Sequence, residues 1–100
     1  MTDIDKYSND IKRLCLLHKV KRLYAFGSVL TDKFSDKSDV DLMVDFEKVD
    51  ITKYADNYFE FKFSLEDILK RPIDLIEEKA IKNPYFIQTI NNQRKLLYGY

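Results

Sequence analysis

The chain has 100 residues, 45% hydrophobic and 14% aromatic, a composition that excludes an intrinsically disordered protein. Its 17 basic and 17 acidic residues balance, so nucleic acid is not expected as a direct ligand. The length predicts a single domain over residues 1–100.

The one cysteine and the lack of long apolar runs indicate the compartment. Cys15 cannot form an internal disulfide, which favours the reducing cytoplasm. No run of about 18 apolar residues exists, so no membrane span is expected. Cys15 lies among leucines and is predicted to be a buried thiol.

The first quarter of the chain predicts a helix followed by a strand. Apolar residues recur at helical spacing between residues 3 and 18, and His18 at the end of this helix is interpreted as a packing or capping residue. Residues 21–26 form a short strand-like run that stops at Gly27.

A second strand is predicted from Val40 to Phe46 by strict alternation along the chain. The residues expected to pack on helices are Val40, Leu42, Val44 and Phe46. The residues on the opposite face are Asp39, Asp41, Met43 and Asp45.

The second half predicts a helix, a strand and a short helix. An apolar and aromatic stripe between residues 50 and 71 indicates a helix that faces the core, and Pro72 follows it. Residues 73–77 form a third strand in which Asp74 interrupts an apolar run. A short helix is expected over residues 83–92, and the pattern of residues 93–98 fits either a strand or more helix. The predicted fold is α/β (α+β), with a small mixed sheet, helices mainly on one face and carboxylates on the other.

Three aspartates on neighbouring strands point to metal chemistry. Asp39 and Asp41 share one strand face, and Asp74 joins them if its strand lies alongside. Carboxylates crowded in one cleft repel one another unless a cation lies among them. Oxygen ligands of this kind suit Mg²⁺, and a pair of such ions can clamp both oxygens of a phosphoryl transfer.

The Gly27-Ser28 turn offers a place for phosphate. Glycine lets the backbone approach a phosphate closely, and the Ser28 hydroxyl and nearby amides can bind its oxygens. The alternative is purely structural. Asp39 could cap a turn, Asp41 could face water, and Asp74 could pair with a neighbouring cation such as Arg71.

Three stretches together carry a family resemblance, namely Ala25–Ser28, Ser38–Leu42 and Pro72–Ile76. Their order and spacing resemble the nucleotidyltransferase superfamily of DNA polymerase β type. Within it, the chain is most similar to the minimal nucleotidyltransferases, the MntA-like antitoxins that are paired with HEPN toxins. The resemblance implies a palm-like fold.

The resemblance also implies roles for individual residues. Gly27 and Ser28 would hold the phosphates of a nucleoside triphosphate such as ATP. Asp39 and Asp41 would bind two Mg²⁺ ions, and Asp74 would bind one of them and help to deprotonate the acceptor. The implied reaction moves AMP, or another nucleoside monophosphate, onto a hydroxyl, in these systems a tyrosine of the HEPN toxin.

One departure from many relatives leaves other functions open. No cation follows Ser28 until Lys33. The alternatives are a non-catalytic antitoxin that acts by binding, or a subunit of a small-molecule nucleotidyltransferase of the aminoglycoside type. Because a chain of this size has little room to cover the site, a partner protein or a second copy is expected to complete it, as a hetero-oligomer or a homodimer.

Overall fold

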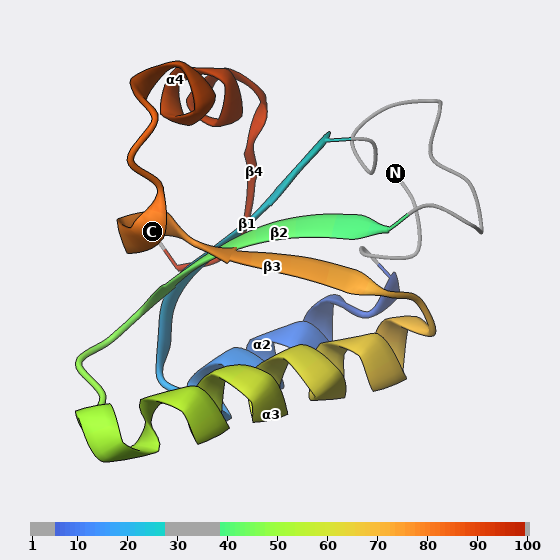
Figure 1. Ribbon diagram of the computed structural model, residues 1–100. Coiled ribbons are helices and arrows are strands. Elements are labelled where there is room, and N and C mark those ends of the chain that lie inside the picture. Colours follow the sequence, from blue (N-terminus) through green and yellow to red (C-terminus); the bar gives the residue numbers. More distant parts are fainter. Residues whose placement is uncertain (1–5, 28–38, 100) are drawn as a thin grey trace.

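The computed structural model describes residues 6–27 and 39–99 and is built on one four-stranded sheet (Figure 1). The elements are α2 (Ser8–Leu17), β1 (Val20–Phe26), β2 (Val40–Phe46), α3 (Ile51–Leu69), β3 (Ile73–Glu77), the 3₁₀ helix η2 (Glu78–Ala80), α4 (Pro84–Gln93) and β4 (Lys95–Tyr98). None of the helices in the described ranges is long and apolar enough to cross a membrane.

The sheet is mixed, with the strand order β3-β2-β1-β4. β1 pairs antiparallel with both β2 and β4, and β2 pairs parallel with β3. A parallel pair needs a crossover connection, and α3 supplies it between β2 and β3. The fold class predicted from the sequence is therefore confirmed.

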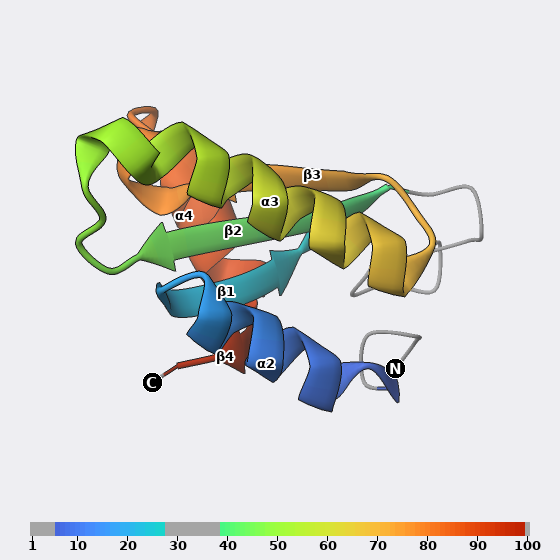
Figure 2. The ribbon, with the colours of Figure 1, turned by 90° about the horizontal axis from the view of Figure 1, so that it is seen from below.

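The main core lies between the sheet and the helices α2 and α3, which run side by side across one face (Figure 2). The predicted inward set of β2 is buried, and so are Phe61, Leu65 and Leu69 from the predicted stripe of α3. Burying each large apolar side chain contributes about 1.5–3 kcal/mol, so this layer supplies most of the stability.

A smaller apolar cluster lies on the opposite face of the sheet, under α4. Tyr24, Phe26 and Met43 project from the strands and pack with Ile90 of α4. The helices therefore lie mainly on one face, as predicted, but α4 covers part of the face that also carries the aspartates.

Local capping explains where α3 and α4 begin. The Asp50 side chain accepts a hydrogen bond from the Thr52 amide at 3.0 Å, which holds the pKa of Asp50 below its usual value. The Asn83 side chain accepts from the amides of Tyr85 and Phe86 in the same way, with Pro84 in the first turn. α3 ends at Leu69, and the left-handed residue Lys70 caps it just before Pro72.

Three further predictions concern the first helix, His18 and residues 93–98. α2 is described from Ser8 to Leu17, and residues 3–5 of the predicted helix lie outside the described residues. The packing role of His18 is confirmed, since its Nδ1 lies 3.0 Å from the Leu14 carbonyl oxygen and its ring contacts Phe61. Residues 93–98, which the sequence left as either strand or helix, include β4, which forms because it pairs with the free edge of β1.

Candidate active site

Asp41 and Asp74 lie directly opposite each other on the parallel strands β2 and β3. Adjacent strands are about 4.8 Å apart, so the two side chains are neighbours. The residues that flank Asp41, Val40 and Leu42, are buried against the helices, and alternation therefore turns Asp41 to the opposite face. Asp74 is exposed between the buried Ile73 and Leu75 in the same way.

Gly27 follows β1 and lies against the carboxylate of Asp41. Phe26, the last residue of β1, pairs with Asp41 across the sheet. A Cβ atom at Gly27 would overlap Oδ2 of Asp41 and lie 3.3 Å from its Cγ. Gly27 also has a φ of +76°, a left-handed conformation that glycine adopts at little cost. Both the space and the backbone therefore require glycine at this position.

The three predicted aspartates influence one another electrostatically. The pKa of Asp41 is raised above its ordinary value, first because the carboxylate is partly buried and then because of the negative charges of Asp74 and Asp39. Asp39 immediately precedes β2 and is exposed. The structure therefore places Asp74 beside Asp41, and Asp39 close enough to raise the pKa of Asp41.

The aspartates do not form a closed cage in the described ranges. No group of three or more histidine, cysteine, aspartate or glutamate side chains among residues 6–27 and 39–99 is gathered closely enough to hold a metal ion as it stands. The donor set nevertheless fits Mg²⁺, because it offers hard carboxylate oxygens whose mutual repulsion a cation would relieve. Ser28, the predicted phosphate ligand, lies outside the described residues.

Asp45 shares the strand face of Asp41 but has a different environment. It is 4% exposed, and its carboxylate forms ion pairs with Arg22 at 3.1 Å and Lys79 at 3.6 Å. Arg22 lies opposite Asp45 in the β1–β2 pairing. Asp45 is thus held by cations of the chain itself and acts as a structural carboxylate.

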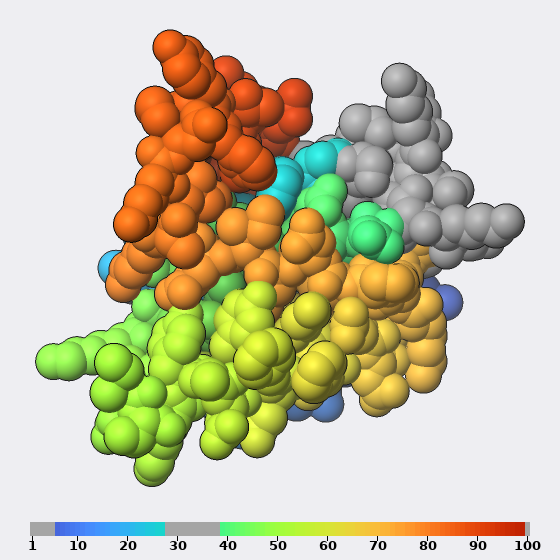
Figure 3. All heavy atoms as spheres, in the orientation of Figure 1, coloured from blue at the N-terminus to red at the C-terminus, as the bar shows by residue number. Residues whose placement is uncertain are grey.

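A hollow beside Gly27 went unrecognised in the sequence. It has a volume of about 380 Å³ and lies between the end of β1 and one side of α4. Figure 3 shows atoms from the ends of β1 and β2 open at the surface next to α4. The residues that line it are Phe26, Gly27, Tyr85, Phe86, Thr89, Ile90 and Gln93. No local pattern marks these residues as a group, because they come from two segments far apart in sequence.

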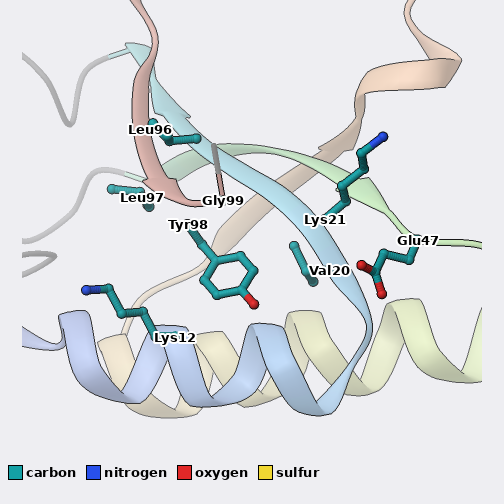
Figure 4. A pocket seen from close by; sticks show the side chains of 8 residues that line it. All are labelled: Lys12, Val20, Lys21, Glu47, Leu96, Leu97, Tyr98 and Gly99. Atoms are coloured by element: carbon teal, nitrogen blue, oxygen red, sulfur yellow. The ribbon is translucent and has the colours of Figure 1, made fainter.

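A second hollow, of about 520 Å³, lies at the other end of β1 (Figure 4). Val20 and Lys21 of β1, Tyr98 of β4 and Lys12 of α2 are among its lining residues. Gly27 and Asp41 are not, because they lie at the opposite end of the β1–β2 pair. This hollow is therefore separate from the candidate active site.

A glycine turn packed on a carboxylate, with a second carboxylate on the adjacent parallel strand, is the arrangement of a nucleotidyltransferase palm. The chain belongs to the family described as "Polymerase beta, Nucleotidyltransferase", whose profile matches residues 9–100. The family expected from the three sequence stretches is thereby confirmed.

Several relatives from Methanocaldococcus jannaschii carry names that class them provisionally as protein adenylyltransferases. The chain is 36% identical over 81 residues to MJ1379, covering 81% of this chain and 78% of that protein. It is 38% identical over 82 residues to MJ0128, with the same coverage of both proteins.

Solved structures share the fold. A provisionally named minimal nucleotidyltransferase superposes with a TM-score of 0.77 at 24% identity, covering 94% of this chain and 95% of the other. A chain of a toxin–antitoxin complex with AMP-PNP gives a TM-score of 0.71 at 24% identity, over 93% of this chain and 73% of the other. A third match is a chain from the structure of the tri-AMPylated Shewanella oneidensis HEPN toxin in complex with MNT antitoxin. It gives a TM-score of 0.66 at 22% identity, covering 97% of this chain and 73% of the other.

Proposed function

We propose that this chain is a Mg²⁺-dependent nucleotidyltransferase that moves AMP from ATP onto a tyrosine hydroxyl of a HEPN-type toxin in the cytoplasm. The observation that carries the proposal is the placement of Asp41 against Gly27 and opposite Asp74. The names of the adenylyltransferase relatives support the reaction type. The structural neighbours that contain AMP-PNP and an AMPylated HEPN toxin support the nucleotide and the partner.

Each of the three carboxylates is assigned a role in binding metal. Asp39 and Asp41 would hold two Mg²⁺ ions, and Asp74 would share one of them. When bound, Mg²⁺ neutralises phosphate charge and polarises the phosphorus that is attacked. The raised pKa of Asp41 agrees with this role, since a nearby cation would favour its ionised form.

The turn after β1 would hold the triphosphate. Gly27 has no side chain, so its backbone can approach phosphate oxygens closely beside Asp41. We assign the Ser28 hydroxyl to the same phosphates. With the triphosphate held in this way, the scissile bond would lie near the carboxylates.

The chemical step exchanges one phosphorus–oxygen bond for another. The acceptor tyrosine oxygen forms a bond to the α-phosphorus of ATP, the bond from that phosphorus to the bridging oxygen breaks, and pyrophosphate leaves. A carboxylate oxygen of Asp74 takes the hydroxyl proton. Asp74 is exposed, so a tyrosine on a separate protein can reach it.

The test is to incubate the chain with a HEPN-type partner, ATP and Mg²⁺ and to measure the mass of the partner. A gain of one or more AMP groups is expected, and Asp39→Ala combined with Asp41→Ala should abolish it. Asp67→Ala is a matched control, because Asp67 is exposed on α3 and pairs only loosely with Lys70 at 4.0 Å. An unmodified partner after incubation with the wild-type chain would refute the transfer.

A second candidate function is neutralisation by binding alone. It is favoured by the sequence after Ser28, which offers no cation before Lys33 to support a triphosphate. In that case the double variant would still neutralise the partner completely, with no change in the partner's mass. If the double variant neither neutralises the partner nor adds AMP to it, the result would favour the enzyme.

A further inference from the structure

The hollow beside Gly27 has the size and lining of a small-molecule site. Its volume of about 380 Å³ falls within the roughly 300–1,000 Å³ that is usual for ligand pockets. Among the described residues that line it, none carries a formal charge. Its walls are mainly aromatic and aliphatic, with Thr89 and Gln93 as the polar members.

We infer that this hollow binds the base of the nucleoside triphosphate, an inference that rests on the proposed function. Gly27 is the shared element, because it lines the hollow and also touches the carboxylate of Asp41. A triphosphate held at Gly27 therefore has its ribose and base within reach of the hollow without crossing the rest of the sheet.

The two ends of a nucleotide have opposite chemistry, and the surface separates them accordingly. The charged triphosphate needs cations, which the three aspartates can recruit. The base is flat and uncharged, and it suits an uncharged aromatic wall. The phosphates thus belong on the Asp41 side of Gly27 and the base on the α4 side.

Two aromatic side chains of α4 are available to stack on a base. Tyr85 is 80% exposed and Phe86 is 41% exposed, so neither is fully used in the core. Phe86 meets Phe26 edge to face, with ring centroids 6.4 Å apart and planes at 75°. This contact fixes one wall of the hollow and leaves Tyr85 free to pack against a ligand.

The polar residues of the hollow can read a base edge. The Thr89 hydroxyl donates a hydrogen bond to the Tyr85 carbonyl at 2.9 Å, which leaves its oxygen to accept another. The amide of Gln93, at the end of α4, offers both a donor and an acceptor. These groups suit the mixed hydrogen-bonding edge of a nucleobase.

The test compares ATP with inorganic tripolyphosphate, which has the phosphates but no base. Both are titrated with Mg²⁺ into the wild type, Tyr85→Ala and Phe86→Ala by calorimetry, with no acceptor present. We expect the Kd for ATP to rise about tenfold in each variant, as for the loss of a stacked base, and the Kd for tripolyphosphate to stay the same. Tyr85→Phe should retain the ATP affinity because it keeps the ring. Phe63→Ala is the control, since Phe63 is 58% exposed on α3, in the other layer of the fold.

Other outcomes overturn the inference in distinguishable ways. If both alanine variants bound ATP as the wild type does, or if the Kd values for ATP and tripolyphosphate rose equally, the hollow would not be the base site. If Tyr85→Ala and Phe86→Ala bound a HEPN-type partner more weakly but kept their ATP affinity, the hollow would be a protein-docking surface instead. Tripolyphosphate that binds the wild type as tightly as ATP would overturn the base site and leave the phosphate site standing. Failure of both probes to bind the wild type would overturn the proposed function as well.

Discussion

The carboxylate of Asp41 occupies the space that a side chain at residue 27 would need. Gly27 has a φ of +76°, and a Cβ atom there would overlap Oδ2 of Asp41. This contact joins the end of β1 to the second residue of β2. It places backbone without a side chain directly beside a carboxylate, where a phosphate and its counter-ion can both be held.

Gly27→Ala is expected to displace Asp41 and to reduce transfer activity about 100-fold, because small misplacements of catalytic groups carry costs of that size. The left-handed backbone alone would cost about 1–3 kcal/mol in stability. Activity and chemical denaturation of the same preparation measure the two effects.

Gly99→Ala is the matched control for that substitution. Gly99 also has a positive φ, +101°, and a Cβ atom there would overlap the Lys21 carbonyl oxygen. It follows β4 at the opposite end of β1 from Gly27, so it should lower stability but leave the Kd for ATP unchanged. If Gly99→Ala weakened ATP binding as much as Gly27→Ala does, the effect at Gly27 would be one of general stability.

Asp41→Asn is expected to stabilise the protein at neutral pH while abolishing activity. The pKa of Asp41 is raised in the folded state, so folding disfavours its ionised form, and its effect on stability worsens as pH rises above 3.8. Because the side chain is partly solvated, solvent screening keeps the gain small, and thermal denaturation at pH 7 should show it as a modest rise in Tm. At pH 3 the asparagine and the protonated aspartic acid should give equal Tm values, and a gain that persists there would point to a cause other than charge.

Mg²⁺ should raise the Tm of the wild type and leave that of Asp41→Asn nearly unchanged. A ligand that binds only the folded state stabilises it in proportion to the logarithm of its concentration over Kd. Melting curves across a Mg²⁺ series, with Asp67→Asn as an exposed control on α3, measure the difference. An identical Mg²⁺ response in all three proteins would contradict the assignment of Asp41 as a metal ligand.

Asp45→Ala should destabilise the fold much more than Asp10→Ala does. Asp45 is buried between Arg22 and Lys79, and its loss leaves the Arg22 guanidinium without its partner. Asp10 forms an exposed pair with Arg13 at 3.6 Å, and such pairs contribute under about 1 kcal/mol. Urea denaturation of the two variants makes the comparison. Equal midpoints would show that the Asp45 pairs add nothing to stability.

Cys15 should resist thiol reagents in the folded protein. The side chain is fully buried, and burial raises the pKa of its thiol to about 12. At pH 8 almost none of it is thiolate, so modification by a disulfide reagent should proceed only as the chain unfolds. Rapid modification under native conditions would show that α2 opens locally from the sheet.

Much of the fold and of the site followed from local pattern. Alternation in β2 predicted which of its residues face the helices, and a helical stripe predicted the buried side of α3. Asp74 stands out in the sequence because a carboxylate interrupts the apolar run that forms β3. These predictions succeed because the period of a helix or strand decides which residues share a face, whatever surrounds them.

Relations between distant segments needed the tertiary structure. Alternation placed Asp45 on the same face as Asp41, but only the pairing of β1 with β2 showed that Arg22 holds it. The sequence left residues 93–98 undecided, because their strand conformation depends on the free edge of β1.

The sequence by itself determined that Gly27, Asp39, Asp41 and Asp74 are candidate site residues. The tertiary structure decided that Asp74 lies opposite Asp41, that Gly27 leaves room for the Asp41 carboxylate, and that α4 and Gly27 line one hollow. The physical reason is register. A shift of one residue between β2 and β3 would turn one aspartate to the buried face, and local pattern contains no information on how two strands are aligned.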